Sequence, residues 1–299
     1  MSAGLRFQLG ARTLWTAPLR LERMSATLDE ALAGKMPKVP PLAPSGHGWL
    51  VGSAPRGELD QLVRPGFFQF VRQCYVRRYA ELGGTYDGWL AGLSGNARSS
   101  LRRKRKKLAQ LTEKSAIRFF RSAKELREFQ ALARPLAALT YQERLLGAGL
   151  PDGPAFAART EALAAEDRVR AWLLTLDERP IAYLWCSAEG TALRYDHVGH
   201  DPAFAELSPG TVLQAAAFEQ LFAERRFARF DFTEGDGQHK RQFATGGVAC
   251  ADVLLLRDTI PNRALVGAVR GFDGGVAVAK RAARHPRLAG VARRVRRAG

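Results

Sequence analysis

Apolar and polar positions in the second half of the chain alternate in blocks that predict a mixed sheet with helices. Three strand-like segments, 169–177, 180–188 and 192–200, are separated only by the short turns "ERP" and "EGT", which predicts an antiparallel meander. A helical period follows over 211–226. The segment "FARFDF" (227–232) then predicts another strand.

The flanking segments extend this pattern in both directions. The segment "AIRFF" (116–120) predicts a strand, and Ser122 with Glu125 forms a capping-box pattern that predicts the start of a helix. A further helix is expected over 153–167, a short one over 237–246 and a last strand over 250–258. The order is therefore strand, helix, helix, meander, helix, strand, short helix, strand.

Residues 1–95 have a weaker pattern of short strands and turns. The segment "GWLVGSAP" (48–55) predicts a strand, and "PGFFQFVRQCYVRRYAEL" (65–82) has apolar residues near helical spacing, which favours a helix. A second helix is expected over 94–111, capped by Ser94 or Asn96. It would pack through leucines and hold a cationic face outward; these are Leu101, Leu108 and Leu111.

The strand–helix–strand step over 191–232 predicts a candidate pocket. Such a step requires a right-handed crossover and a parallel strand pair, and ligands of open sheets bind beyond the carboxyl ends of parallel strands. Polar groups follow both strands: "YDH" (195–197) on the first and "DFTEGD" (231–236) on the second. The helix between them starts at "SPGTV" (208–212), where free N–H groups and the helix dipole favour a phosphate.

Composition adds a strong charge and few constraints on chemistry. The 299 residues include 46 Lys or Arg against 29 Asp or Glu, a net charge of +17, which favours an anionic partner. Three scattered cysteines form no metal-ligand or disulfide pattern, so we expect no metal and a cytoplasmic protein. No signal peptide or membrane-spanning run is found. We expect a soluble protein that lies at most peripherally on the inner membrane.

The succession of elements over about 115–258 resembles the GNAT acyltransferase superfamily. The resemblance rests on "YDHVGHDPAFAELSPGTVLQ" (195–214) and "FDFTEGDGQHKRQFA" (230–244), and "LSGNARSSLRRKRKKL" (93–108) is similar to a basic segment of one branch. That branch contains the cellulose-biosynthesis CelD-like proteins and is related to the Fem aminoacyltransferases. It implies an α/β fold with a mixed sheet, arranged as tandem GNAT-like halves of which the first is degenerate.

The resemblance also implies how an acyl donor would bind. The pantetheine arm of acyl-CoA would enter between splayed strands 191–198 and 228–233, with its pyrophosphate on the helix that begins near Gly210. The donor-contacting residues would be Ser208, Gly210, Thr211, Val212, Lys240 and Arg241. The usual Arg/Gln-x-x-Gly-x-Gly/Ala signature is replaced by "AELSPGT" (205–211), which leaves acyl-CoA, an acyl-carrier protein and aminoacyl-tRNA open as donors.

The expected reaction is direct transfer of an acyl group to an amine. This reaction needs a base for the amine, and the preferred base is Asp196 or His197, with Tyr195 protonating the leaving thiolate. The remaining acidic and imidazole groups are Asp231, Glu234, Asp236 and His239, of which Glu234 and Asp236 would bind the ammonium. The alternative is structural: Tyr195 and His197 would share one buried face, and Asp231 would pair with Lys240 or Arg241.

These expectations divide the chain into three parts. Residues 1–110 would be the degenerate half with its basic linker helix, 111–262 the catalytic domain, and 263–299 a basic amphipathic or disordered tail. The expected acceptor is an amine-bearing small molecule, or a lipid or envelope amine such as a sphingoid base, with an anionic membrane surface as partner. Two other functions stay open: a Fem-like transferase that uses aminoacyl-tRNA, and a non-catalytic nucleic-acid-binding or scaffold protein.

Overall fold

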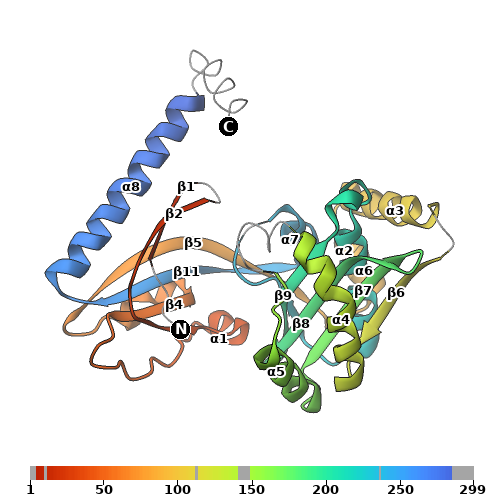
Figure 1. Ribbon diagram of the computed structural model, residues 1–299, viewed down its shortest axis with the longest axis horizontal. Coiled ribbons are helices and arrows are strands. Elements are labelled where there is room, and N and C mark those ends of the chain that lie inside the picture. The colour runs from red at the N-terminus through yellow and green to blue at the C-terminus, as the bar shows by residue number, and fades with distance from the viewer. Residues whose placement is uncertain (1–4, 10–11, 112–113, 141–148, 236, 285–299) are drawn as a thin grey trace.

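The protein has two halves that share one sheet. The computed structural model describes residues 5–9, 12–111, 114–140, 149–235 and 237–284. Two long strands, β5 (Phe67–Glu81) and β11 (Gly246–Arg257), run between the halves (Figure 1). The "TYQERLL" segment (140–146) lies outside the described residues from 141 onward, and so does the tail from 285.

The N-terminal half is built mainly from strands. Its other elements are β1 (Leu5–Leu9), β2 (Arg12–Ala17), β3 (Leu21–Ser25), α1 (Leu28–Leu32), β4 (Gly48–Pro55) and the 3₁₀ helix η1 (Arg56–Leu62). Strands β1 and β2 form a separate antiparallel hairpin. The predicted strand over 48–55 is therefore present as β4.

The second half follows the order of elements expected from the sequence. Its elements are α2 (Tyr86–Gly92), α3 (Gly95–Ala109), β6 (Ser115–Phe120), α4 (Ala123–Leu139), α5 (Pro154–Ala165), β7 (Val169–Leu176), β8 (Arg179–Glu189), β9 (Ala192–His200), η3 (Pro202–Leu207), α6 (Pro209–Glu224), β10 (Arg229–Asp231), α7 (Gln238–Phe243) and α8 (Ile260–Arg284). The capping box is formed, since Ser122 and Glu125 bond each other's backbone N–H at the start of α4.

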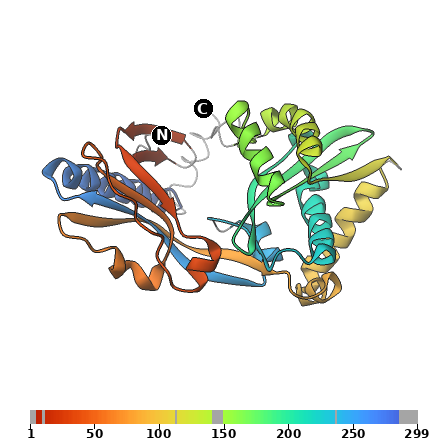
Figure 2. The same ribbon diagram turned by 90° about the horizontal axis from the view of Figure 1, so that it is seen from below.

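The large sheet has nine strands within the described residues, in the order β3-β4-β11-β5-β10-β9-β8-β7-β6. Helices α4 and α5 cover one face of β7–β9, while α2, α3 and α6 cover the other, so each face has its own apolar core (Figure 2). Strand β11 leaves the second half and pairs with β4 and β5. The last predicted strand thus completes the N-terminal part of the sheet.

The helix predicted over 65–82 is wrong, because this segment is strand β5. Its full length pairs with neighbours, through β11 from Phe67 to Tyr79 and through β10 from Tyr79 to Glu81. Phe68 and Phe70 have the two-residue period of a strand, and arginines of α8 stack on both rings at 5.1 Å. Pairing on both edges therefore outweighs the apparent helical spacing.

Helix α3 forms as expected, with Ser94 as its cap. The Ser94 side chain accepts a hydrogen bond from the Ala97 N–H, and Leu101 and Leu108 are buried. Leu111 is 53% exposed, so it does not belong to the packed stripe. It lies beyond Ala109, where the helix has ended and its period no longer holds. The basic residues between the leucines face solvent, except for half-buried Lys104.

The expected parallel pair is formed by β9 and β10 with α6 as the crossover. The two strands pair only over Ala192–Arg194 and Arg229–Asp231. Beyond this point β9 continues to His200 along β8, while Phe232 donates its backbone N–H to the carbonyl of Arg78 in β5. The two segments therefore part after Arg194 and Asp231.

Helix α8 extends away from the sheet beside the β1–β2 hairpin (Figure 1). Val266 and Val269 are buried against the N-terminal strands, whereas Ile260 and Val278 are exposed. The expected amphipathic helix is therefore present up to Arg284. In the described part of the chain, no helix combines the length and the apolar character needed to cross a membrane.

Candidate active site

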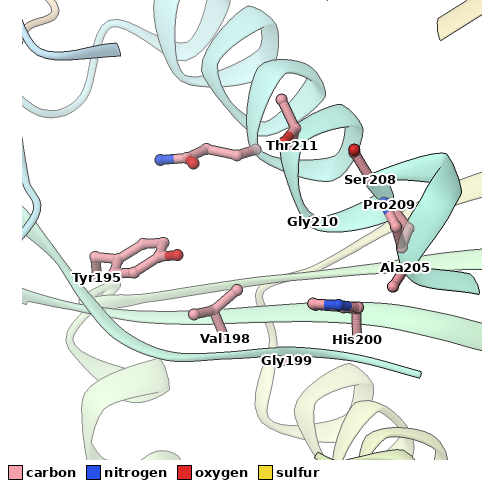
Figure 3. A pocket seen from close by; sticks show the side chains of 10 residues that line it. Tyr195, Val198, Gly199, His200, Ala205, Ser208, Pro209, Gly210 and Thr211 are labelled. Carbon is pink, nitrogen blue, oxygen red and sulfur yellow. The ribbon is translucent and has the colours of Figure 1, made fainter. Parts of the chain in front are cut away.

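A cleft of about 300 Å³ opens between the second part of β9 and the first turn of α6. Figure 3 shows Tyr195 and Val198 on the β9 side, with Ser208, Gly210 and Thr211 on the α6 side. The rest of the lining is Gly199, His200, Ala205, Pro209 and Gln214. The cleft thus lies where β9 has left β10, as expected for a ligand site at the end of a parallel pair.

The first turn of α6 is shaped to approach a ligand closely. Ser208 has a left-handed backbone (φ 52°) and makes no side-chain capping bond, and Pro209 occupies the first helical position. A Cβ added to Gly210 would meet no atom of the chain within 4 Å. Because helix N-termini carry a partial positive charge, this open turn suits an anionic group.

The other expected donor contacts lie elsewhere. Val212 is 4% exposed and packs in the core beneath the cleft. The Lys240 ammonium bonds the backbone carbonyl of Glu234, and Arg241 lines a different cavity beside the start of α3. Neither of these two cations lines the cleft.

A β-bulge places Tyr195 and His197 on opposite faces of the sheet. The register between β8 and β9 shifts at Trp185 and Cys186, so that Trp185 faces His197 and Cys186 faces Tyr195. Tyr195 consequently packs in the core under α6, while His197 meets rings on the side of α5. The expectation that both would share one face is wrong, because strand alternation is broken by the extra residue.

The two preferred bases lie on the face away from α6. Asp196 accepts hydrogen bonds from the backbone N–H and the hydroxyl of Ser187, at 2.8 and 2.6 Å. The His197 ring lies between Phe156 and Trp185, at 5.9 and 5.5 Å between centroids. Burial lowers the pKa of His197, and the nearby Asp196 charge offsets part of this change. The imidazole is therefore neutral at pH 7 and able to accept a proton.

Tyr195 faces the cleft with its phenol. Its ring packs against Phe230 and Phe232, at 5.9 and 6.1 Å between centroids. Burial raises the pKa of Tyr195 well above that of a free phenol. The hydroxyl is therefore protonated at neutral pH and suits a proton donor, not a base.

Comparison with known proteins identifies the domain. Residues 95–241 match the family model of the acetyltransferase (GNAT) domain. The chain is a GNAT-type transferase. No curated protein matches the sequence significantly.

Solved structures with this GNAT architecture cover most of the chain. The C-terminal domain of a putative lysylphosphatidylglycerol synthetase from Agrobacterium fabrum has a TM-score of 0.50 at 10% identity, covering 75% of this chain and 72% of that one. L-PGS from Bacillus licheniformis has 0.47 at 13% identity, covering 75% and 72%. FemX has 0.47 at 12% identity, covering 74% of each chain. At such identities the likeness is one of fold.

Asp231 of the GNAT domain is held by an ion pair that the sequence did not suggest. Both carboxylate oxygens accept from Arg77 of β5, at 3.1 and 2.6 Å, and one also accepts from the Thr233 N–H at 2.8 Å. Arg77 is 3% exposed and Asp231 is fully buried. The partner expected for Asp231 was Lys240 or Arg241, and this expectation is wrong because β5 lies next to β10.

The loop after β10 is described in part. Glu234 is exposed and faces a second cavity between the two halves of the chain. Asp236 and the His239 side chain lie outside what the structure describes. The expected ammonium site is thus described only through Glu234.

Three residues of the GNAT cleft were not singled out from the sequence. Gln214 is 3% exposed, and its buried Nε2 has no hydrogen-bond partner among the described residues. Its spacing of four from Gly210 places both on one helix face, which was the available signal. His200 ends β9 at the cleft, and Lys104 of α3 lies 3.4 Å from the Thr211 hydroxyl.

Proposed function

We propose that the protein transfers an acyl group from acyl-CoA or an acyl-carrier protein to an amine. The observation that carries this proposal is the cleft between diverging β9 and α6, with open Gly210 at its phosphate end. Past Arg194, β9 pairs with β8 alone among the described strands, so the other edge of its backbone faces the cleft. That edge suits the amides of a pantetheine arm.

Helix α3 supplies the cation that the unusual "AELSPGT" sequence lacks. Lys104 reaches the Thr211 hydroxyl at 3.4 Å, and Lys107 reaches the Glu206 carbonyl at 3.5 Å. Burial lowers the pKa of Lys104. We infer that Lys104 and the N–H groups of the first turn of α6 bind the donor phosphates, while Gln214 donates to the arm.

The residues on the two faces of β9 have complementary roles in the transfer. The amine nitrogen bonds to the thioester carbon while the carbon–sulfur bond breaks. The nitrogen gives its proton to a base, for which neutral His197 is best suited because Asp196 already accepts two hydrogen bonds from Ser187. The departing thiolate takes a proton from the Tyr195 hydroxyl.

Gly210→Val is expected to weaken donor use without weakening the fold. The new side chain enters open space inside the cleft, so it meets the donor and no part of the protein. We expect the KM for acyl-CoA to rise about tenfold, which corresponds to about 1.4 kcal/mol of binding. Release of free thiol from acyl-CoAs and acyl-carrier-protein thioesters, with a panel of amines, is the assay.

Gly267→Val is the matched control, because Gly267 also faces open space but lies on α8. The proposal fails if the unchanged chain turns over none of these donors. It also fails if the two glycine variants have the same KM for the donor.

The acceptor we propose is an amine of a lipid or of the cell envelope, such as a sphingoid base. The net charge of +17 and the amphipathic helix α8 support a position at an anionic membrane surface. Mass spectrometry of lipids and envelope extracts, from cells with and without the gene, tests this. A missing N-acylated lipid supports the proposal, and unchanged lipids with a changed envelope polymer contradict the lipid acceptor.

Aminoacyl-tRNA is a second candidate donor, favoured by the exposed cationic face of α3. For this candidate, neutralising Arg102, Arg103 and Lys106 together is expected to reduce the slope of log binding constant against log salt by about one for each phosphate that is no longer neutralised. Filter binding of tRNA over a salt series measures the slope. An equal slope for the triple variant and for Arg127→Gln on α4 removes this candidate.

A further inference from the structure

A second cavity of about 350 Å³ lies where the N-terminal strands meet the GNAT domain. Its lining comes from β3, β4, β9, β11 and the loop after β10: Arg23, Met24, Ser25, Leu50, Gly52, Ser53, Arg194, Glu234 and Asp252. Two cations and two carboxylates thus surround one space, with Met24 and Leu50 as its apolar part. The site needs both halves of the chain.

One wall of this cavity is a rigid polar network. Asp252 lies at register shifts in the pairing of β11 with both β4 and β5. Its carboxylate accepts from the Ser53 N–H at 2.9 Å, from Gln73 Nε2 at 2.6 Å and from the Tyr75 hydroxyl at 3.1 Å. Ser53 has a left-handed backbone (φ 52°), and its hydroxyl lies 2.8 Å from that of Tyr75. Bulges of this kind redirect side chains and are common beside functional sites.

The opposite wall adjoins the reaction centre. Arg194 lines this cavity, and the next residue, Tyr195, lines the donor cleft. The last pairing between β9 and β10 is at Arg194, so the gap between the strands opens beside both spaces. Arg194 also lies 3.6 Å from Asp196 on the face away from α6. A molecule in the second cavity would therefore approach the donor from the face that holds His197.

The charges on the walls indicate what kind of molecule fits. Arg194 contacts Glu189 and Asp196 at 3.4 and 3.6 Å, and its buried Nε has no hydrogen-bond partner within the described part of the chain. Arg23 is exposed at the same cavity, and Glu234 offers an exposed carboxylate. Asp252 is occupied by its three donors, which leaves Glu234 as the carboxylate for an ammonium.

We propose that this cavity binds the acceptor, and that the acceptor is a primary amine that also carries a phosphate or carboxylate group. Glu234 binds the ammonium, and Arg194 with Arg23 binds the anionic group. The inference deepens the proposed function and rests on it for the identity of the bound molecule as acceptor. The site itself is a property of the chain without any acyl donor.

Calorimetric titration of the full chain with four compounds tests the site without acyl donor. O-phosphoethanolamine and β-alanine carry both charges, ethanolamine lacks the anion, and ethyl phosphate lacks the amine. At least one of the doubly charged compounds is expected to bind about tenfold more tightly than either singly charged one. The stronger of the two identifies phosphate or carboxylate as the recognised group.

Arg194→Gln and Glu234→Gln are each expected to weaken this binding about tenfold. Glu234 is exposed, so its variant keeps the test valid if Arg194→Gln lowers stability. Arg127→Gln and Glu161→Gln, which break an exposed ion pair between α4 and α5, are matched controls expected to bind normally.

The proposal is overturned if none of the four compounds binds, or if both cavity variants bind as the controls do. Normal binding of the amine by a chain that turns over no acyl donor would instead contradict the proposed function alone. Gly210→Val separates the two sites in the same way, because it is expected to leave amine binding unchanged.

Discussion

Asp231→Asn is expected to lower the free energy of unfolding by about 3–5 kcal/mol, because it leaves the Arg77 charge buried without its partner. The loss should be large because Arg77 donates to both Asp231 oxygens and also binds the Ala26 carbonyl at 2.7 Å. These contacts join α1, β5 and β10, so one substitution disturbs the junction between the halves. Urea unfolding followed by circular dichroism measures the change.

Two comparisons separate this effect from a general loss of charge. Glu128→Gln breaks an exposed pair with Arg118 and should change the unfolding free energy by less than about 1 kcal/mol. Replacing the pair together, as Arg77→Met with Asp231→Leu, should recover part of the lost stability because no charge is left buried. If Asp231→Asn folds with normal stability and loses turnover, Asp231 acts in catalysis and the structural assignment is wrong.

The second half of the fold was predictable because its signals are local. Strands 169–200 are separated by short turns, and the Ser122–Glu125 capping box fixes the start of α4. Neither feature depends on distant parts of the chain. The crossover over 191–232 then determines a parallel pair by handedness alone, and the structure confirms it as β9 and β10.

The errors arise where distant contacts decide the outcome. Strand β5 was predicted as a helix because its two neighbours, β10 and β11, come about 150 residues or more later in the chain. The partner of Asp231 was misassigned for the same reason, since Arg77 lies on β5. The bulge in β9 separated Tyr195 from His197, and a period of two contains no sign of an inserted residue.

Site prediction shows the same division. Ser208, Gly210 and Thr211 were found because a proline–glycine helix start has a recognisable sequence. Lys104 was seen only as part of a basic helix, because its place beside Thr211 depends on how α3 packs on α6. The second cavity was not predictable from the sequence, since it is assembled from five separate segments.

Tyr195→Phe is expected to lower kcat about 100-fold or more, with little change in the KM for the donor. The hydroxyl is the proton donor we assign to the departing thiolate, and burial keeps it protonated by raising its pKa. The ring and its contacts with Phe230 and Phe232 are retained in the variant, so folding should be unaffected. Tyr86→Phe removes another phenol, one that contacts Arg105 outside the cleft, and should leave kcat unchanged.

The choice of donor distinguishes proton donation from simple packing. A thioester whose thiol has a low pKa leaves without protonation, so the Tyr195→Phe variant should lose much less rate with an aryl thioester than with an alkyl one. A packing defect would slow both donors equally, because it alters the position of the thioester and not the chemistry of its departure. Equal losses would therefore remove Tyr195 as the acid and move that role to another group of the cleft, of which exposed His200 is the nearest along β9.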